Sequence, residues 1–283
     1  MLELISRNKH LIITLALLSL CFILVYYQVI LQLAYSWDNN PNYSHGYFIP
    51  FISGFMIWYK REEIFGQPIS PRPVLGMILM LAGLMQLMVA WVGSEHFLQA
   101  SSMIPVLIGL SLVFWGTAVT RKLLVPILFL IFMIPLPAIL WNQLAFPLAL
   151  MASKIGASAV DMMGLPILRE GNILYLPGVT LQVEEACSGL RSLTTLFALS
   201  ALIAYMSPLW RLSKLIIFLA AIPIALVGNV VRLIATAVLA RYYGPGMAEG
   251  FIHDFSGWLL FVFGLIFLML LQSLFTRWEG RES

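Results

Sequence analysis

Charged residues are scarce in this chain of 283 residues. Asp, Glu, Lys and Arg make up 10% of it, whereas 61% of the residues are hydrophobic. A composition of this kind excludes an ordinary water-soluble domain. The net charge of +3 is small and the basic residues lie at the ends of apolar runs, so nothing predicts a nucleic-acid partner. We therefore expect an integral membrane protein, embedded in the lipid bilayer as a single polytopic domain over residues 1–283.

Cysteine is equally scarce. Cys21 and Cys187 lie far apart in unlike surroundings, which excludes a disulfide framework. No cluster of ligand-type side chains predicts a metal site, and no cofactor is expected. The first apolar run, over residues 11–33, is too long for a signal peptide and lacks a small-residue cleavage site, so it is expected to span the membrane.

Long apolar runs dominate what is present. They predict an all-α fold with about eight transmembrane helices, each roughly 20 residues long as the bilayer requires. The expected spans cover about residues 11–34, 46–60, 73–93, 102–120, 122–142, 187–208, 212–240 and 252–275. The second is short, and Pro135 and Pro137 interrupt the fifth.

Basic residues predict the orientation of these spans. With the N-terminus in the cytoplasm, most of the 16 Lys and Arg residues fall on inner segments. The short outer loops, about 36–45 and 94–101, then contain no Lys or Arg. Both termini are therefore expected in the cytoplasm.

A long connection over about residues 143–186 is expected on the outer side. Its first half, residues 144–163, has the pattern of an interfacial helix or a partial span. Its second half carries two short β-patterned runs on either side of Pro177-Gly178. This pattern predicts a small hairpin that leads the chain to Cys187.

One stretch of eight residues concentrates polar groups in this apolar chain. It contains Glu184, Glu185, Cys187, Ser188, Gly189 and Arg191. Polar groups at membrane depth are costly and usually functional. A cysteine that opens a helix lies where free N–H groups and the helix dipole stabilise its thiolate, and the same N–H groups can receive an oxyanion. The stretch is therefore a candidate nucleophile site centred on Cys187.

The expected topology adds two partners on the same side of the membrane. Arg232 lies about two turns from the outer end of the seventh span, and His253 begins the eighth. Spans six to eight follow one another through short turns, so their outer ends can face one another. His253 changes protonation near neutral pH and suits acid–base work, whereas Arg232 stays charged and suits binding of a carboxylate or an oxyanion.

Each of these residues alone also has a structural explanation. Cys187 fits a small packed helix residue, Arg232 fits an ion pair with a nearby carboxylate, and His253 fits an interfacial cap. Their coincidence at one membrane face favours catalysis. Two rival hypotheses are a transporter whose polar groups line a solute path, and a non-catalytic assembly factor in which they form an ion-pair network.

Four motifs, taken together, carry a resemblance to a known family. They are Tyr43-Ser-His45-Gly46, Val183-Glu-Glu-Ala-Cys187-Ser-Gly-Leu-Arg191, Asn229-Val-Val-Arg232 and His253-Asp-Phe-Ser-Gly257-Trp258. In order and spacing they resemble the exosortase/archaeosortase family of membrane transpeptidases, over about residues 40–270. His253 favours the bacterial exosortase branch. Some members carry an additional C-terminal domain associated with exopolysaccharide production, and this chain resembles the core module without it.

The resemblance implies a catalytic triad of Cys187, Arg232 and His253. Asn229 is expected to orient Arg232, while His45 has either a role at a helix boundary or a place in the site lining. The remaining expected lining residues are Glu184, Glu185, Ser188, Gly189 and Arg191.

The resemblance also implies the partners and the location. The substrates are secreted proteins with a C-terminal Pro-Glu-Pro (PEP-CTERM) sorting signal, a membrane helix and a basic cytoplasmic tail. Cleavage through a cysteine thioester passes the protein to water or to an acceptor in the cell envelope, such as a polysaccharide or a lipid. The enzyme is expected in the bacterial inner membrane with its active site facing the periplasm.

Overall fold

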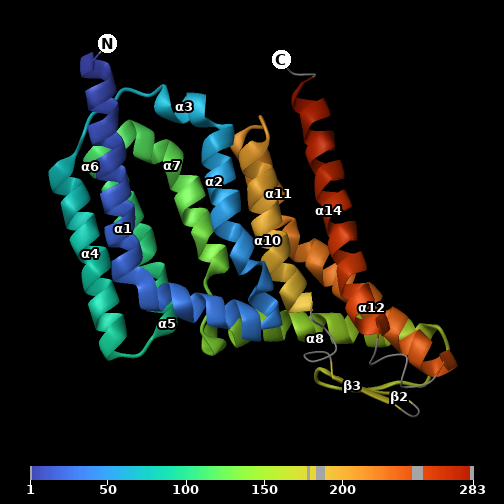
Figure 1. Ribbon diagram of the computed structural model, residues 1–283. Helices are drawn as coiled ribbons and strands as arrows, with labels where there is room; N and C mark the ends of the chain where they lie inside the picture. Colours follow the sequence, from blue (N-terminus) through green and yellow to red (C-terminus); the bar gives the residue numbers. More distant parts are fainter. Residues whose placement is uncertain (1, 177–178, 183–188, 244–250, 281–283) are drawn as a thin grey trace. The chain divides into compact units, whose positions relative to one another are not determined.

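The computed structural model describes the backbone of residues 2–176, 179–182, 189–243 and 251–280, and most of it is helical (Figure 1). The chain forms two compact units. The first comprises Met1–Asn40 and Lys60–Pro135, and the second comprises Pro41–Tyr59 and Leu136–Ser283.

The first unit is built from helices alone. Its elements are α1 (Leu2–Asn39), α3 (Arg61–Phe65), α4 (Pro73–Val92), α5 (His96–Ser101), α6 (Met103–Phe114), α7 (Thr117–Phe129) and the 3-10 helix η2 (Leu130–Met133). The most extensive packing is between α4 and α6. These helices approach closely because Gly76 and Gly109 have no side chains. A Cβ atom added to Gly76 would lie 2.7 Å from the carbonyl oxygen of Gly109, and one added to Gly109 would lie 2.7 Å from the carbonyl oxygen of Gly76.

Side-chain hydrogen bonds join distant segments of this unit. The Tyr26 and Ser102 hydroxyls lie 3.1 Å apart, which connects α1 to the beginning of α6. The indole Nε1 of Trp37 donates to the carbonyl oxygen of Met133 at 2.8 Å, which connects the end of α1 to η2. Buried polar groups of a membrane protein need such partners, because the hydrocarbon region supplies none.

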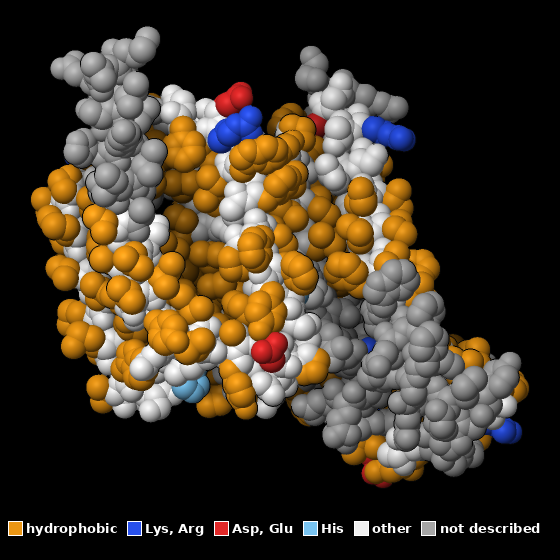
Figure 2. Space-filling model, viewed as in Figure 1, with side chains coloured by type: hydrophobic (Ala, Val, Ile, Leu, Met, Phe, Trp, Pro, Cys, Tyr) orange, Lys and Arg blue, Asp and Glu red, His pale blue; other side chains and the backbone are white. Residues whose placement is uncertain are grey.

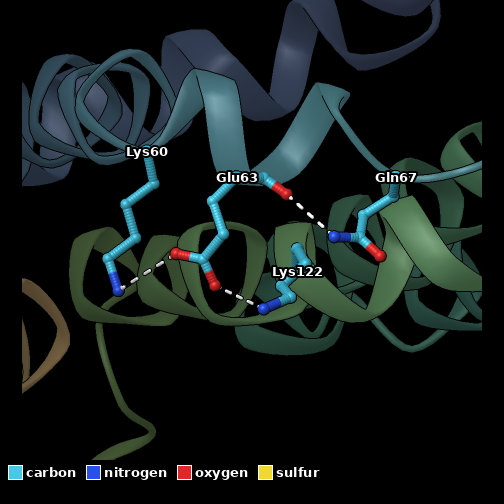
Figure 3. Close-up of polar contacts among 4 residues, drawn as sticks. All are labelled: Lys60, Glu63, Gln67 and Lys122. Carbon is cyan, nitrogen blue, oxygen red and sulfur yellow. Dashed lines mark hydrogen bonds and ion pairs between the residues drawn. The ribbon is translucent and has the colours of Figure 1, made fainter.

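One ion pair joins the short helix α3 to α7 (Figure 3). The Glu63 carboxylate contacts Lys122 of α7 and lies 3.8 Å from Lys60 Nζ. The Gln67 amide donates to the Glu63 carbonyl oxygen at 3.2 Å. These side chains are partly exposed, so each pair contributes little free energy, and the buried Ile64 adds the apolar part of the contact.

The second unit contains the remaining helices and the only described sheet. Its helices are η1 (Pro41–Phe48), α2 (Ile49–Tyr59), α8 (Ala138–Met162), α10 (Gly189–Met206), α11 (Arg211–Leu219), α12 (Ala221–Tyr243) and α14 (Phe251–Glu279). Its strands are β1 (Leu168–Glu170), β2 (Ile173–Leu176) and β3 (Val179–Gln182), which form an antiparallel sheet in the order β1-β2-β3. The predicted hairpin is thus confirmed as β2 and β3, and β1 is a strand that the sequence pattern missed.

Helices α10, α12 and α14 pack against one another in pairs. Their shared core includes Leu196, Ala225 and Leu268. At one end of this group, the backbone N–H of Trp210 donates to Glu279 Oε2 at 2.9 Å, and the rings of Trp210 and Trp278 meet edge to face. The end of α14 therefore lies beside the turn between α10 and α11.

A second core joins the sheet to α8 and α12. Leu174 and Leu176 of β2 pack with Ala152 of α8 and with Val230 and Leu233 of α12. Within this unit, α8 runs across the direction of α10 and α14 (Figure 1). Such a direction fits the interfacial alternative for residues 144–163.

The structure confirms a helical membrane protein, and it does not confirm a count of eight spans. Among the described residues, five helical segments are long and apolar enough to cross a bilayer: Leu17–Asn39, Pro73–Val92, His96–Phe114, Arg211–Tyr242 and Phe261–Glu279. The third joins α5 to α6, and the fourth joins α11 to α12. A shorter apolar helix covers Leu193–Met206. On the face drawn in Figure 2, hydrophobic side chains cover the flanks of the helices, as contact with lipid requires.

Three expected spans are divided. The expected fourth span, residues 102–120, is shared between α6, which ends at Phe114, and α7, which begins at Thr117. The expected second span, residues 46–60, is shared between η1 and α2. The expected fifth span, residues 122–142, is not one helix, because α7 ends at Phe129 and α8 begins at Ala138. Pro135 and Pro137 lie between them, and proline lacks the N–H group that a continuing helix needs.

Candidate functional site

Arg232 is the most deeply buried charged residue for which burial is described. It is 2% exposed, in the middle of α12, and Glu279 at 8% is the only other charged residue in the buried class among the described side chains. A guanidinium is costly to remove from water, and an ionisable group inside a membrane helix is a functional-site candidate by default. Arg232 is therefore the principal candidate site residue among the described side chains.

The packing of α12 explains why Arg232 faces inward. Each helical residue turns the side chain by about 100°, so Val227 and Val231 share one stripe, and they are 61% and 53% exposed. Val230 and Leu233, on either side of Arg232 in sequence, pack against α8 and β2. Arg232 lies on the part of the helix turned away from the exposed stripe.

Asn229 lies one turn before Arg232 on nearly the same face of α12. Its Oδ1 atom is buried and makes no hydrogen bond with any described residue. Because Oδ1 is the only side-chain atom of Asn229 that can accept a hydrogen bond from a guanidinium, the two side chains are not hydrogen-bonded. No hydrogen bond therefore joins Asn229 to Arg232, and the Asn229 amide presents a buried acceptor.

The stretch from 184 to 191 falls only partly within the described residues. Glu184, Glu185, Cys187 and Ser188 lie outside them, as do the side-chain contacts of Arg191. The flanking elements are described: β3 ends at Gln182 and α10 begins at Gly189. Cys187 thus lies in the short connection from a strand to the beginning of a membrane helix.

His253 stands in the first turn of α14, and its backbone alone is described. The contact between Trp210 and Glu279 places the α10–α11 turn beside the end of α14, so the beginnings of α10 and α14 share the opposite end of this unit. Helices α11 and α12 run from the Trp210 end toward that opposite end, as Figure 1 shows. The three helices connected with the predicted triad therefore lie together in this unit. Helix α10 follows Cys187, α12 carries Arg232 and α14 carries His253.

The early Tyr43-Ser-His45-Gly46 motif belongs to the same unit. It forms most of η1, which packs against α10. The rings of Tyr43 and His45 stack with centroids 6.2 Å apart, and the Tyr43 hydroxyl accepts the backbone N–H of Leu136 at 3.0 Å. Nothing in the sequence spacing could have predicted this, because about 140 residues separate η1 from α10.

Burial sets the ionisation of Tyr43. It raises the pKa of the phenol above its ordinary value of 10.0, and the hydrogen bond from Leu136 opposes that change to a smaller degree. Tyr43 is therefore a neutral phenol at physiological pH. It can hold η1 and the beginning of α8 in place, and it is no candidate for the base.

The described residues contain no group of three or more His, Cys, Asp or Glu side chains arranged to hold a metal ion.

Fold and site together define a multi-pass helical membrane protein with a buried arginine and a strand-to-helix connection that carries a cysteine. The sequence model of the family "Transmembrane exosortase" matches residues 37–270. The chain therefore belongs to the exosortase family, and the resemblance inferred from the four motifs is confirmed. Comparisons with curated proteins and with solved structures gave no match.

Proposed function

We propose that this exosortase is a cysteine transpeptidase of the inner membrane that cleaves C-terminal Pro-Glu-Pro sorting signals at the periplasmic face. One structural observation carries the proposal. A deeply buried arginine on α12 lies in a group of three mutually packed helices. Of the other two, one begins two residues after Cys187 in the sequence and one carries His253 in its first turn. An ionisable group inside a membrane helix is a functional-site candidate by default, and a buried guanidinium suits an anionic substrate group.

The proposed reaction is acyl transfer. The Cys187 thiolate attacks the carbonyl carbon of the scissile peptide, and the carbonyl π electrons move to oxygen as the S–C bond forms. Collapse of this intermediate breaks the C–N bond, and His253 gives a proton to the leaving amine. The membrane tail of the substrate departs, and its secreted part stays on Cys187 as a thioester.

A second nucleophile then resolves the thioester. An amine on an envelope acceptor gives transpeptidation, and water gives hydrolysis. In either case the attacking nucleophile gives a proton to His253, and the thioester bond breaks to regenerate Cys187. The group at the new C-terminus of the released protein distinguishes transpeptidation from hydrolysis. Mass spectrometry of its new C-terminal peptide shows either a free carboxyl group or an adduct.

Arg232 is proposed to bind negative charge. A guanidinium stays protonated throughout the working pH range, so it transfers no proton, and its planar fork matches a carboxylate. The Glu of the sorting signal and the oxyanion of the intermediate are the two candidate anions. His45, Arg191, Glu184 and Glu185 are proposed to line the site around it.

The decisive experiment follows tail removal from a tagged secreted protein that carries the sorting signal. Co-expression with the wild-type chain should shorten the substrate, and Cys187→Ala should abolish this. Cys21→Ala is the matched control, because Cys21 is an exposed residue of α1, and it should process the substrate normally. Equal processing by wild type and Cys187→Ala would refute the thiol mechanism and return the transporter and assembly-factor hypotheses to consideration.

A further inference from the structure

The sheet before Cys187 has two edges of unlike character. Its order leaves β1 on one edge and β3 on the other. The β1 edge carries Arg169 and Glu170, both exposed, and Arg169 Nη1 donates to the Gly171 carbonyl oxygen at 2.8 Å. Charged side chains are a common protection of an edge strand against further pairing.

The β3 edge lacks that protection. Its four residues, Val-Thr-Leu-Gln, carry no charge. Among the described residues, β3 pairs with β2 and with no second strand. Successive residues of a strand direct their N–H and C=O groups to opposite edges, so every second residue of β3 has both groups turned away from β2.

The sheet is held in place by the body of its unit. Leu174 and Leu176 of β2 pack against α8 and against the α12 residues that flank Arg232. Ser153 of α8 donates to the Gly171 carbonyl oxygen at 2.9 Å, which fixes the β1–β2 turn. A strand that pairs with β3 would therefore join a sheet that is already fixed against α12, the helix that carries Arg232.

Sequence proximity connects the β3 edge with the nucleophile. Only residues 183–186 separate Gln182 from Cys187. The β1 edge lies two strands further away, which is about 10 Å at the usual strand spacing. Of the two edge strands, β3 is therefore the nearer to Cys187 along the chain.

We propose that the substrate binds by adding its sorting-signal segment to β3 as a fourth strand. This inference rests on the proposed function and specifies how that site holds its substrate. Main-chain hydrogen bonds to β3 would supply affinity with little dependence on side chains. The same pairing would fix the distance along the chain from the paired residues to the scissile bond at Cys187.

The two prolines of Pro-Glu-Pro define the register of such a strand. They are two positions apart, so they face the same edge, and neither has an N–H group. The strand can therefore pair with β3 in only one parity, with the Glu N–H and C=O toward β3 and both prolines outward. The second proline also favours an extended backbone at the Glu, which reduces the entropy lost on binding.

A proline scan of the substrate tests this register. Each residue from the Glu toward the scissile bond is replaced by proline in turn, with alanine at the same position as the control. Proline at positions an even number of residues from the Glu removes an N–H group that faces β3, so it should reduce processing roughly tenfold for each hydrogen bond lost. Proline at positions an odd number of residues from the Glu should have little effect. A loss that does not alternate along the chain would overturn strand addition.

Cross-linking supplies a second, structural readout. Thr180→Cys on β3 and Arg169→Cys on β1 are placed separately in the Cys21→Ser, Cys187→Ala background, and single cysteines are moved along the sorting signal. Directly opposed residues of paired strands have the spacing that a disulfide needs. Thr180→Cys should form disulfides at one or two signal positions, and Arg169→Cys should form none. Equal cross-linking at both edges, or at the β1 edge alone, would overturn the proposal.

These outcomes separate the inference from the proposed function. If the wild-type chain does not process the signal, or does so without Cys187, the proposed function fails first. If processing depends on Cys187 but shows neither alternation nor cross-links to Thr180→Cys, only the strand addition fails.

Discussion

Asn229 and Arg232 are two polar residues on nearly the same face of α12, and both belong to the proposed site. Leaving a buried acceptor without a hydrogen bond costs about 1–3 kcal/mol, and the Asn229 Oδ1 atom is such an acceptor among the described residues. An apolar residue at this position would avoid that cost. Under the proposed function, a hydrogen-bond donor of the bound substrate would satisfy this acceptor.

This explanation predicts a separation of stability from activity in Asn229→Leu. Removal of an unsatisfied acceptor should leave thermal stability in detergent unchanged or higher, whereas processing of the tagged substrate should fall about tenfold or more. Asn229→Gln, which retains the amide, is the matched control and should keep part of the activity. A variant that is destabilised but processes normally would show that Asn229 is a structural residue.

The residue scale also shows which parts of the site the sequence could predict. An arginine within an apolar helix stands out in any sequence, so Arg232 was identified without coordinates. The spacing of Asn229 and Arg232 predicted a shared face, which is present, and it could not predict that the Asn229 Oδ1 atom makes no hydrogen bond among the described residues. Helical periodicity determines the direction of a side chain and leaves its rotamer open.

Among the elements, α4 and α6 form the most extensively packed helix pair of the first unit. Each glycine of the Gly76–Gly109 contact leaves room for the carbonyl oxygen of the other helix. Van der Waals packing of this kind drives helix association in membranes, because lipid tails are as apolar as the side chains that they would replace. The contact therefore depends on the absence of two Cβ atoms.

Gly109→Ala should accordingly destabilise the protein. A new Cβ atom 2.7 Å from a carbonyl oxygen forces the helices apart, which we expect to cost about 1–3 kcal/mol in thermal unfolding of the detergent-solubilised chain. Gly54→Ala on α2 is the control, because a Cβ atom there meets nothing within 4 Å, and it should be neutral or slightly stabilising. Equal stability of the two variants would contradict the close packing of α4 and α6.

The elements differ in how well apolar runs predict them. The runs over 73–93, 212–240 and 252–275 correspond to long helices of the structure. The run over 122–142 failed as a single span because a sum of hydrophobicity takes no account of the missing N–H groups of Pro135 and Pro137. The strand β1 was missed because Leu-Arg-Glu is too short and too polar to show a period of two.

For the whole molecule, the second unit supplies a way to test the orientation. The Trp210–Glu279 hydrogen bond gathers Arg211 and Arg277 at one end of the α10–α11–α14 group, and the sheet adjoins the beginning of α10 at the other. Basic residues at one end of a helix group predict the cytoplasmic side. The sheet and the proposed active site should then face the periplasm.

Single-cysteine labelling of intact cells tests this orientation directly. In the Cys21→Ser, Cys187→Ala background, Tyr175→Cys on β2 and Arg211→Cys at the start of α11 are each exposed to a membrane-impermeant thiol reagent. Both residues lie on the surface of the folded chain, so burial does not hide them. Tyr175→Cys should react in intact cells and Arg211→Cys only after the cells are lysed. The reverse pattern would place the site in the cytoplasm, where a secreted substrate never presents its signal, and would exclude the proposed function even if the fold and the buried Arg232 remained as described.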